Sequence, residues 1–255
     1  MIQAIQNAPG LVPWFKRWFD SSYYHKLYGN RDEKEAAGFI NELISCLQPA
    51  TGSTMLDVGC GAGRHCKQLA AKGYHVTGID LASSSIREAK QFQSDSLHFF
   101  RHDMRVPFGK NSFDYVFSFF TSFGYFKEQD QNNKVVNNMS NAVKPGGMLV
   151  LDYINVRYSE DHLIEMETKE IDGITLTITR WMDQKNFFKK IVIGDQQLEN
   201  PLEYVEQVAK FDLVDFYVMF SRCKLQIQEV YGDYSLSAYD PKTSPRLVMI
   251  AKKSV

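Results

Sequence analysis

Strand-like segments alternate with helix-like segments through the middle of the chain, and this alternation restricts the fold more than any other feature. Short apolar runs lie at 54–58, 75–79, 97–101, 115–119 and 148–152, with helical patterns between most of them. Neighbouring parallel strands need long, right-handed crossover connections of this kind. The pattern therefore predicts an α/β fold built on a mostly parallel sheet.

The pattern changes on both sides of this core. Residues 11–48 are helical in pattern and rich in aromatic side chains, which predicts a helical cap over 1–50. Residues 155–210 alternate with period two, as in ITLTITRW, and predict a small antiparallel insertion. The core is expected over 51–154 and 211–255. A small sheet is not stable alone, so its apolar face must pack on the aromatic N-terminal cap or on a second copy of the chain. We expect the insertion to cover the active-site mouth as a lid or to form a subunit contact in a homodimer.

A glycine-rich loop, LDVGCGAGRH at 56–65, follows the first strand and precedes a helix. Glycine lets the backbone turn sharply and approach a ligand closely. A dinucleotide-binding fingerprint has Gly or Ala at its sixth position. Counted from Gly59, that position is Arg64; counted from Gly61, it is Cys66. The loop therefore predicts a bound ligand and argues against a nicotinamide dinucleotide.

Acidic side chains lie near the carboxyl end of each of the first three strands. Asp57 lies two residues before the first glycine, where a carboxylate opposes a pyrophosphate but suits a ligand with an ammonium group. Asp80 ends the second strand, a position from which a carboxylate binds both ribose hydroxyls. Asp103 ends the third strand and can accept a hydrogen bond from an adenine amino group, with Met104 against the ring. For Asp103, a turn or helix cap is the alternative role.

The segments LDVGCGAG, GIDLA, RHDM and VKPGGMLVLD resemble, in order and spacing, the successive motifs of class I S-adenosylmethionine-dependent methyltransferases. The resemblance covers 54–155 and the two closing strands. It implies a Rossmann-like, seven-stranded sheet whose last strand, 247–251, is antiparallel, with S-adenosyl-L-methionine as cofactor. It places the glycine loop at the methionine part, the second strand end at the ribose, the third at the adenine and the fourth near the sulfonium. The residues so implied are Gly59, Cys60, Gly61, Asp80, Leu81, Asp103, Met104 and Phe119.

The segment YYHKLYGNR, at 23–31, is similar to a stretch of small-molecule N- and O-methyltransferases that folds over the cofactor. This similarity makes Tyr24, Tyr28 and Arg31 candidates for binding the methionine carboxylate. The alternative is that these tyrosines only pack the helical cap.

No catalytic triad is shared by these enzymes, because the sulfonium methyl group is already activated and the protein mainly aligns the nucleophile. A base is needed only when the nucleophile starts protonated. The candidates for a catalytic role are His25, Tyr153 and Arg246. We expect methyl transfer to a nitrogen or oxygen atom of a small molecule. The alternatives are a nicotinamide-dependent oxidoreductase and a protein that binds S-adenosylmethionine without turnover.

Composition bears on partners and setting. The chain has 29 basic and 30 acidic side chains, so it lacks the basic surplus typical of nucleic-acid-binding proteins. Its four cysteines form no CxxC pair, which favours reduced thiols in the cytoplasm. Cys60, His65 and Cys66 lie close together, but their place in a ligand loop argues against a metal site. We expect no signal peptide, and no run approaches the roughly 20 apolar residues that span a bilayer.

Overall fold

A computed structural model describes residues 13–28 and 33–255, which divide into two compact units. One unit is formed by residues 13–28 together with His162–Lys210. The other is formed by residues 33–161 together with Phe211–Val255. Among the described residues, none of the helices has the length and apolar character needed to cross a bilayer.

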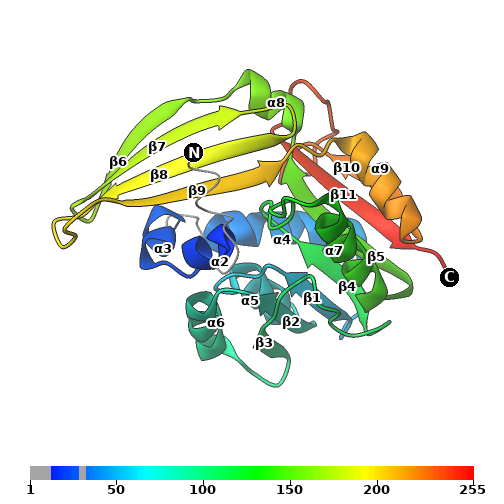
Figure 1. The fold of residues 1–255 in the computed structure, drawn as a ribbon. Helices are drawn as coiled ribbons and strands as arrows, with labels where there is room; N and C mark the ends of the chain where they lie inside the picture. Colours follow the sequence, from blue (N-terminus) through cyan, green and yellow to red (C-terminus); the bar gives the residue numbers. More distant parts are fainter. Residues whose placement is uncertain (1–12, 29–32) are drawn as a thin grey trace. The chain divides into compact units, whose positions relative to one another are not determined.

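The larger unit contains a seven-stranded sheet in the order β10-β11-β5-β4-β1-β2-β3 (Figure 1). Strand β11 pairs antiparallel with both of its neighbours, and the other pairs are parallel. The expectation of a Rossmann-like sheet with an antiparallel last strand is therefore confirmed. The strands are β1 (Thr54–Val58), β2 (His75–Asp80), β3 (Leu97–Arg101), β4 (Phe113–Ser118), β5 (Val143–Ile154), β10 (Leu225–Tyr231) and β11 (Arg246–Lys253).

Helices cover both faces of this sheet. Helices α4 (Glu33–Leu47), α5 (Arg64–Ala71) and α6 (Ser83–Ala89) share one apolar cluster with the central strands. In α4 the buried side chains of Ala36, Phe39, Ile40 and Leu43 recur at helical spacing, so one face packs inward. Helices α7 (Gln129–Ala142) and α9 (Leu213–Arg222) pack with β4, β5 and β10.

The smaller unit is an antiparallel sheet, in the order β6-β7-β8-β9, on which two helices pack. In the first half of β7, Ile174, Leu176 and Ile178 alternate with less buried residues and pack with Trp18 and Leu27, as the period-two pattern predicts. The expected antiparallel insertion is thus confirmed. The elements are α2 (Trp14–Phe19), α3 (Ser22–Tyr28), β6 (Met166–Ile171), β7 (Ile174–Met182), β8 (Asn186–Gly194) and β9 (Leu202–Ala209).

One local feature differs from the expectations. A short helix, α8 (Val156–Asp161), follows β5 where the period-two pattern predicted strands. Helix α6 starts after Ala82, whose side chain cannot cap it, although three serines follow. Asp80 instead accepts a hydrogen bond from the amide of Ala82 (2.8 Å), which stabilises the start of the helix.

Candidate functional site

The glycine loop between β1 and α5 is held tightly on one side and open on the other. The amides of Gly59 and Cys60 donate to the Ile79 carbonyl at 2.8 and 3.0 Å, which fixes the loop to the end of β2. A Cβ on Gly59 would lie 2.5 Å from Cβ of Ser122, so a side chain does not fit there. A Cβ on Gly61, at φ +54°, would meet no atom of the described residues within 4 Å. Among these residues nothing fills the space over Gly61, which can therefore receive a ligand.

Asp57 lies at the end of β1 and is almost completely buried, with 1% of its surface exposed. The Cys66 thiol donates to Oδ2 of this carboxyl group at 3.4 Å. Its Oδ1 atom has no hydrogen-bond partner among the described residues. Burial raises the pKa of Asp57 to about 7, against the opposing effect of the Cys66 hydrogen bond. A buried carboxyl oxygen without a partner is costly, so this atom is suited to a cationic or hydrogen-bonding ligand group.

Asp80 joins the end of β2 to the glycine loop. Its Oδ2 atom accepts a hydrogen bond from the Gly61 amide at 2.9 Å, while Oδ1 accepts from Ala82. Leu81 is half-buried, and its carbonyl accepts from Nε of Arg101 at 3.1 Å. The structure thus brings three predicted cofactor-binding residues, Gly61, Asp80 and Leu81, to one edge of the sheet. At this edge, the carboxyl ends of parallel strands bind ligands in open α/β sheets.

Asp103 is bound by its neighbour Arg105. The Arg105 side chain donates to Oδ1 from Nε (3.0 Å) and to Oδ2 from Nη2 (2.7 Å), and its amide also donates to Oδ1 (2.9 Å). These contacts lower the pKa of Asp103, with the Arg105 side-chain hydrogen bond as the largest cause. Binding of an adenine amino group by Asp103 remains a prediction. It requires a lone pair on one of the Asp103 carboxylate oxygens that Arg105 does not use.

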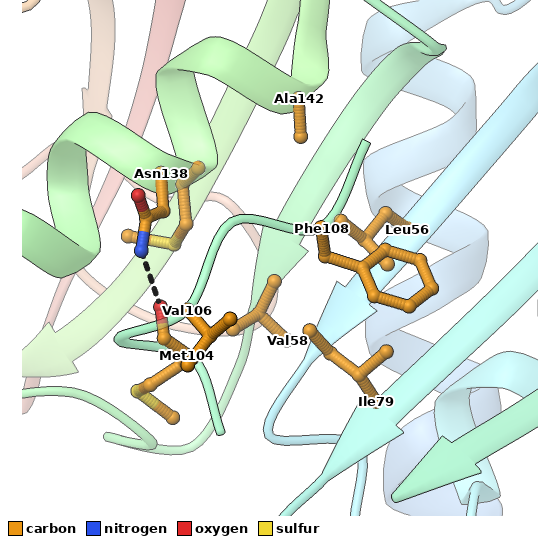
Figure 2. A pocket seen from close by; sticks show the side chains of 9 residues that line it. Leu56, Val58, Ile79, Met104, Val106, Phe108, Asn138 and Ala142 are labelled. Carbon is orange, nitrogen blue, oxygen red and sulfur yellow. Dashed lines mark hydrogen bonds between the residues drawn. The ribbon is translucent and has the colours of Figure 1, made fainter. Parts of the chain in front are cut away.

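Met104 lies between the glycine loop and α7. Its Cε atom is 3.8 Å from the position that a Cβ on Gly59 would take, and its carbonyl accepts a hydrogen bond from Asn138 at 3.0 Å. Figure 2 shows this bond beside a small apolar cavity of about 10 Å³, lined by residues such as Leu56, Val58 and Phe108. A cavity of this size barely admits one water molecule, so it is a packing defect rather than a ligand pocket.

Phe119 and Cys60 are buried. Phe119 stacks on Phe117 with ring centroids 5.1 Å apart and lies 4.8 Å from His65. Burial raises the pKa of the Cys60 thiol to about 11, so the thiol keeps its proton at neutral pH. In the part of the chain that the structure describes, no group of three His, Cys, Asp or Glu side chains is arranged to hold a metal ion.

Arg246 and Tyr153 have different surroundings, although both lie near the ends of adjacent strands. The Arg246 guanidinium pairs with the carboxylate of Asp152, with Nη2 and Oδ1 2.6 Å apart. Tyr153 is fully buried and packs against Phe123 and Phe216. Burial raises the pKa of Tyr153 well above its usual value. Neither side chain is therefore suited to act as a base at neutral pH. Asp152, which sequence reasoning treated only as a strand end, joins this site.

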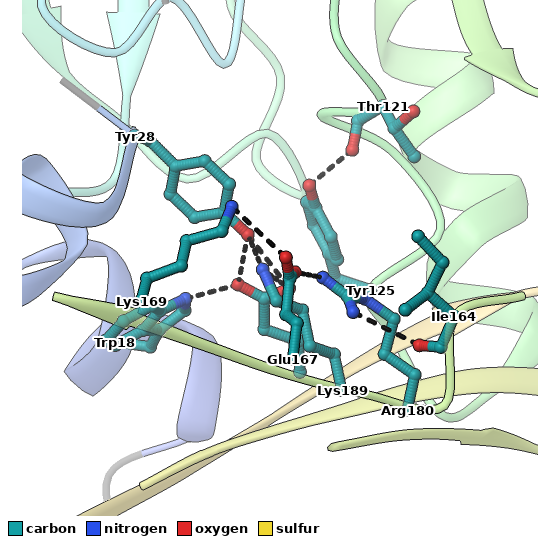
Figure 3. A network of polar contacts seen from close by, with 10 residues as sticks. Trp18, Tyr28, Thr121, Tyr125, Ile164, Glu167, Lys169, Arg180 and Lys189 are labelled. Atoms are coloured by element: carbon teal, nitrogen blue, oxygen red, sulfur yellow. Dashed lines mark hydrogen bonds and ion pairs between the residues drawn. The ribbon is translucent and has the colours of Figure 1, made fainter. Parts of the chain in front are cut away.

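Three further candidates, Tyr24, His25 and Tyr28, lie in the smaller unit. Tyr28 donates to Oε1 of Glu206 at 3.0 Å and accepts a hydrogen bond from Lys189 (Figure 3). Tyr24 packs against Tyr28, and His25 packs against Tyr24. Arg31 lies outside the described residues. Binding of the methionine carboxylate by Tyr24, Tyr28 and Arg31, and a catalytic role for His25, stay predictions.

Three comparisons relate the chain to known proteins. Residues 55–147 match a family described as "Methyltransferase domain". A protein of Geobacillus sp. (strain WCH70), described as a methyltransferase, is 24% identical over 91% of this chain and 97% of its own length. The dTDP-3-amino-3,4,6-trideoxy-alpha-D-glucopyranose N,N-dimethyltransferase of Streptomyces venezuelae is 28% identical over 48% of this chain and 51% of its own. The crystal structure of an S-adenosylmethionine-dependent methyltransferase from Clostridium acetobutylicum shares the fold, with a TM-score of 0.76 and 19% identity over 91% of this chain and 96% of its own.

Proposed function

Because the chain belongs to the class I S-adenosylmethionine-dependent methyltransferases, we propose that it transfers a methyl group to a nitrogen or oxygen atom of a small molecule. The observation that carries this proposal is the buried carboxyl group of Asp57 beside an open glycine loop. Its Oδ1 atom lacks a partner among the described residues, and the space over Gly61 is open.

The residues present fit the cofactor. When bound, S-adenosylmethionine supplies a methyl group on a positively charged sulfonium. Asp57 offers a buried negative charge for the ammonium group of the methionine part. Asp80 stands where a carboxylate binds ribose hydroxyls, and its hydrogen bond to Gly61 keeps the loop in place. A phosphate group near Asp57 would be repelled, so this donor set opposes a dinucleotide.

A small-molecule acceptor is supported by the relative from Streptomyces venezuelae, whose name specifies an amino sugar as its substrate. The balanced charge of the chain gives no reason to expect a phosphate backbone as partner. Since Tyr153 keeps its proton and Arg246 is paired with Asp152, an amine that arrives uncharged is the acceptor best served by this site. A cytoplasmic setting, a lid role for 155–210 and a homodimer belong to the same proposal.

A screen of acceptors tests this function. Purified protein is incubated with S-adenosylmethionine and panels of amines, amino sugars, phenols and tRNA, and S-adenosylhomocysteine is measured by mass spectrometry. We expect release that depends on a small amine or hydroxyl compound and is lost in Asp57→Asn. Release that depends only on tRNA would contradict the substrate class. Tight cofactor binding with no release in any panel would favour a protein that binds the cofactor without turnover.

A further inference from the structure

Two consecutive residues after β4 adopt a backbone conformation that side chains disfavour. Phe120 and Thr121 have φ angles of +54° and +58°, and neither is glycine. Such left-handed residues persist only where surrounding contacts hold them, and they concentrate at functional sites. The next residue, Ser122, donates from Oγ to the Gly59 carbonyl at 3.2 Å. The strained turn therefore adjoins the glycine loop.

The carboxyl group of Asp152 holds this turn. Its Oδ2 atom accepts hydrogen bonds from the Phe120 amide (2.7 Å) and the Tyr234 hydroxyl (3.1 Å). The Thr121 amide donates to the Asp152 carbonyl at 3.1 Å. The ring of Phe120 also packs on Tyr234, with centroids 5.0 Å apart. Contacts from β5 and the loop before β11 thus converge on these two strained residues.

Arg246 completes the network from the start of β11. It donates to Oδ1 of Asp152 from Nε at 2.8 Å, and to the Thr121 hydroxyl from Nη2 at 2.9 Å. Asp152 is 0% exposed and the Arg246 side chain 17%, so the carboxylate of the pair is shielded from water. A buried ion pair stabilises a fold no better than well-packed apolar residues of similar size. Its presence beside a strained turn is better explained by a requirement for fixed geometry.

We infer that Asp152 and Arg246 are positioning residues for methyl transfer, which hold the turn at Phe120 and Thr121 in its left-handed conformation. The turn then offers a fixed surface beside the glycine loop, against which the reacting groups are aligned. This inference rests on the proposed function. In this role Arg246 acts through the turn and makes no contact with the acceptor. Small displacements of such aligning surfaces lower the rate of transfer more than they weaken binding.

The test uses the full-length protein with Arg246→Met, Arg246→Lys and the double variant Arg246→Met with Thr121→Gly. Arg157→Met is the matched control, because it breaks an exposed ion pair with Asp161 in the same unit. Amide hydrogen exchange is followed by mass spectrometry, binding of S-adenosylhomocysteine by calorimetry, and kcat and KM with the acceptor found in the screen.

We expect Arg246→Met to speed exchange of the Phe120 and Thr121 amides by roughly tenfold, with exchange in β1 unchanged. It should lower kcat by roughly tenfold while KM for the cofactor changes less than about threefold. Arg246→Lys should be intermediate. Adding Thr121→Gly should recover part of kcat, because glycine reaches the left-handed region without strain. The control should match the wild type in every measurement.

If the Phe120 and Thr121 amides exchange at the wild-type rate in Arg246→Met, the inference is overturned. If Arg246→Met does not fold, the same measurement on Arg246→Lys decides. A loss that appears only as a raised KM for the acceptor, with no recovery in the double variant, would also overturn it and indicate direct substrate contact. If the wild-type protein transfers methyl groups to no acceptor, the proposed function fails, whereas the exchange measurement still decides whether Arg246 holds the turn.

Discussion

The buried carboxyl group of Asp57 predicts that cofactor binding depends on pH. Its pKa is raised to about 7, mainly by burial, so the group is largely protonated at pH 5. The ammonium group of the ligand stays protonated below pH 7, because an α-amino group has a pKa of about 7.7–8.0. If binding requires the ionised carboxylate, the dissociation constant of S-adenosylmethionine should be roughly fiftyfold larger at pH 5 than at pH 7.

The same group affects the stability of the ligand-free protein in the opposite direction. A carboxyl group with a raised pKa binds its proton more tightly in the folded than in the unfolded chain. Its contribution to stability is therefore fully present below the ordinary pKa of 3.8 and is lost as the pH rises through about 7. The shift corresponds to about 4 kcal/mol. Between pH 4 and pH 8, the free energy of unfolding should therefore fall less in Asp57→Asn than in the wild type, because the asparagine side chain does not titrate.

Calorimetric titrations at pH 5, 6 and 7, with chemical denaturation at the same values, measure both effects. Asp57→Asn should bind the cofactor weakly at all three values, with little dependence on pH. Asp161→Asn, which removes an exposed carboxylate, should behave like the wild type. The reasoning is refuted if Asp57→Asn keeps the full pH dependence, because another group would then be responsible, or if wild-type affinity falls from pH 5 to pH 7.

Four further substitutions test separate parts of the account. Gly61→Val should abolish binding of S-adenosylmethionine in calorimetry while circular dichroism still shows a folded chain. The side chain enters space that no described residue fills, and valine also strains the loop at φ +54°. Retained binding would contradict the site. Asp80→Ala should weaken cofactor binding more than Asp103→Ala, because Asp103 is already bound by Arg105. Each charged hydrogen bond lost should cost about 1.5–3 kcal/mol of binding free energy. Equal losses in the two variants would mean that the two ends of the nucleoside are misassigned. Trp18→Ala should destabilise the smaller unit by about 3–5 kcal/mol. Limited proteolysis should then cleave the chain faster within residues 162–210. An unchanged cleavage rate would contradict the packing of α2 on its sheet.

The order of strands and helices in the core could be predicted because it depends on neighbours along the chain. Alternating apolar segments, a glycine loop after the first strand and acidic residues at strand ends are local features. Right-handed crossovers then bring the carboxyl ends of the strands to one edge. For the same reason, the position of Asp57 and Asp80 at this edge could be predicted from their place in the motif.

The network around Asp152 could not be predicted, since its partners are distant in sequence. Arg246 lies 94 residues from Asp152, and no periodicity links them. The left-handed turn at Phe120 and Thr121 also escaped, because that conformation is expected of glycine, and Gly124 was the nearest one.

The composition of the smaller unit could be predicted only in part. A small sheet needs a partner for its apolar face, and the N-terminal cap was one of two alternatives, beside a second copy of the chain. Trp18 of α2 donates to Glu206, 188 residues away, at 2.5 Å and shares an apolar cluster with β7, contacts that no local pattern specifies. The short helix α8 was missed because six residues carry too little periodicity to outweigh their surroundings.

Calorimetry of the wild-type protein with S-adenosylmethionine, S-adenosylhomocysteine and NAD tests the central claim most directly. The buried carboxylate of Asp57 and the open glycine loop predict binding of the first two in the micromolar range and no measurable binding of NAD. Binding of NAD as tight as that of S-adenosylmethionine would contradict the account, because a pyrophosphate would then be accepted where the structure places a carboxyl group.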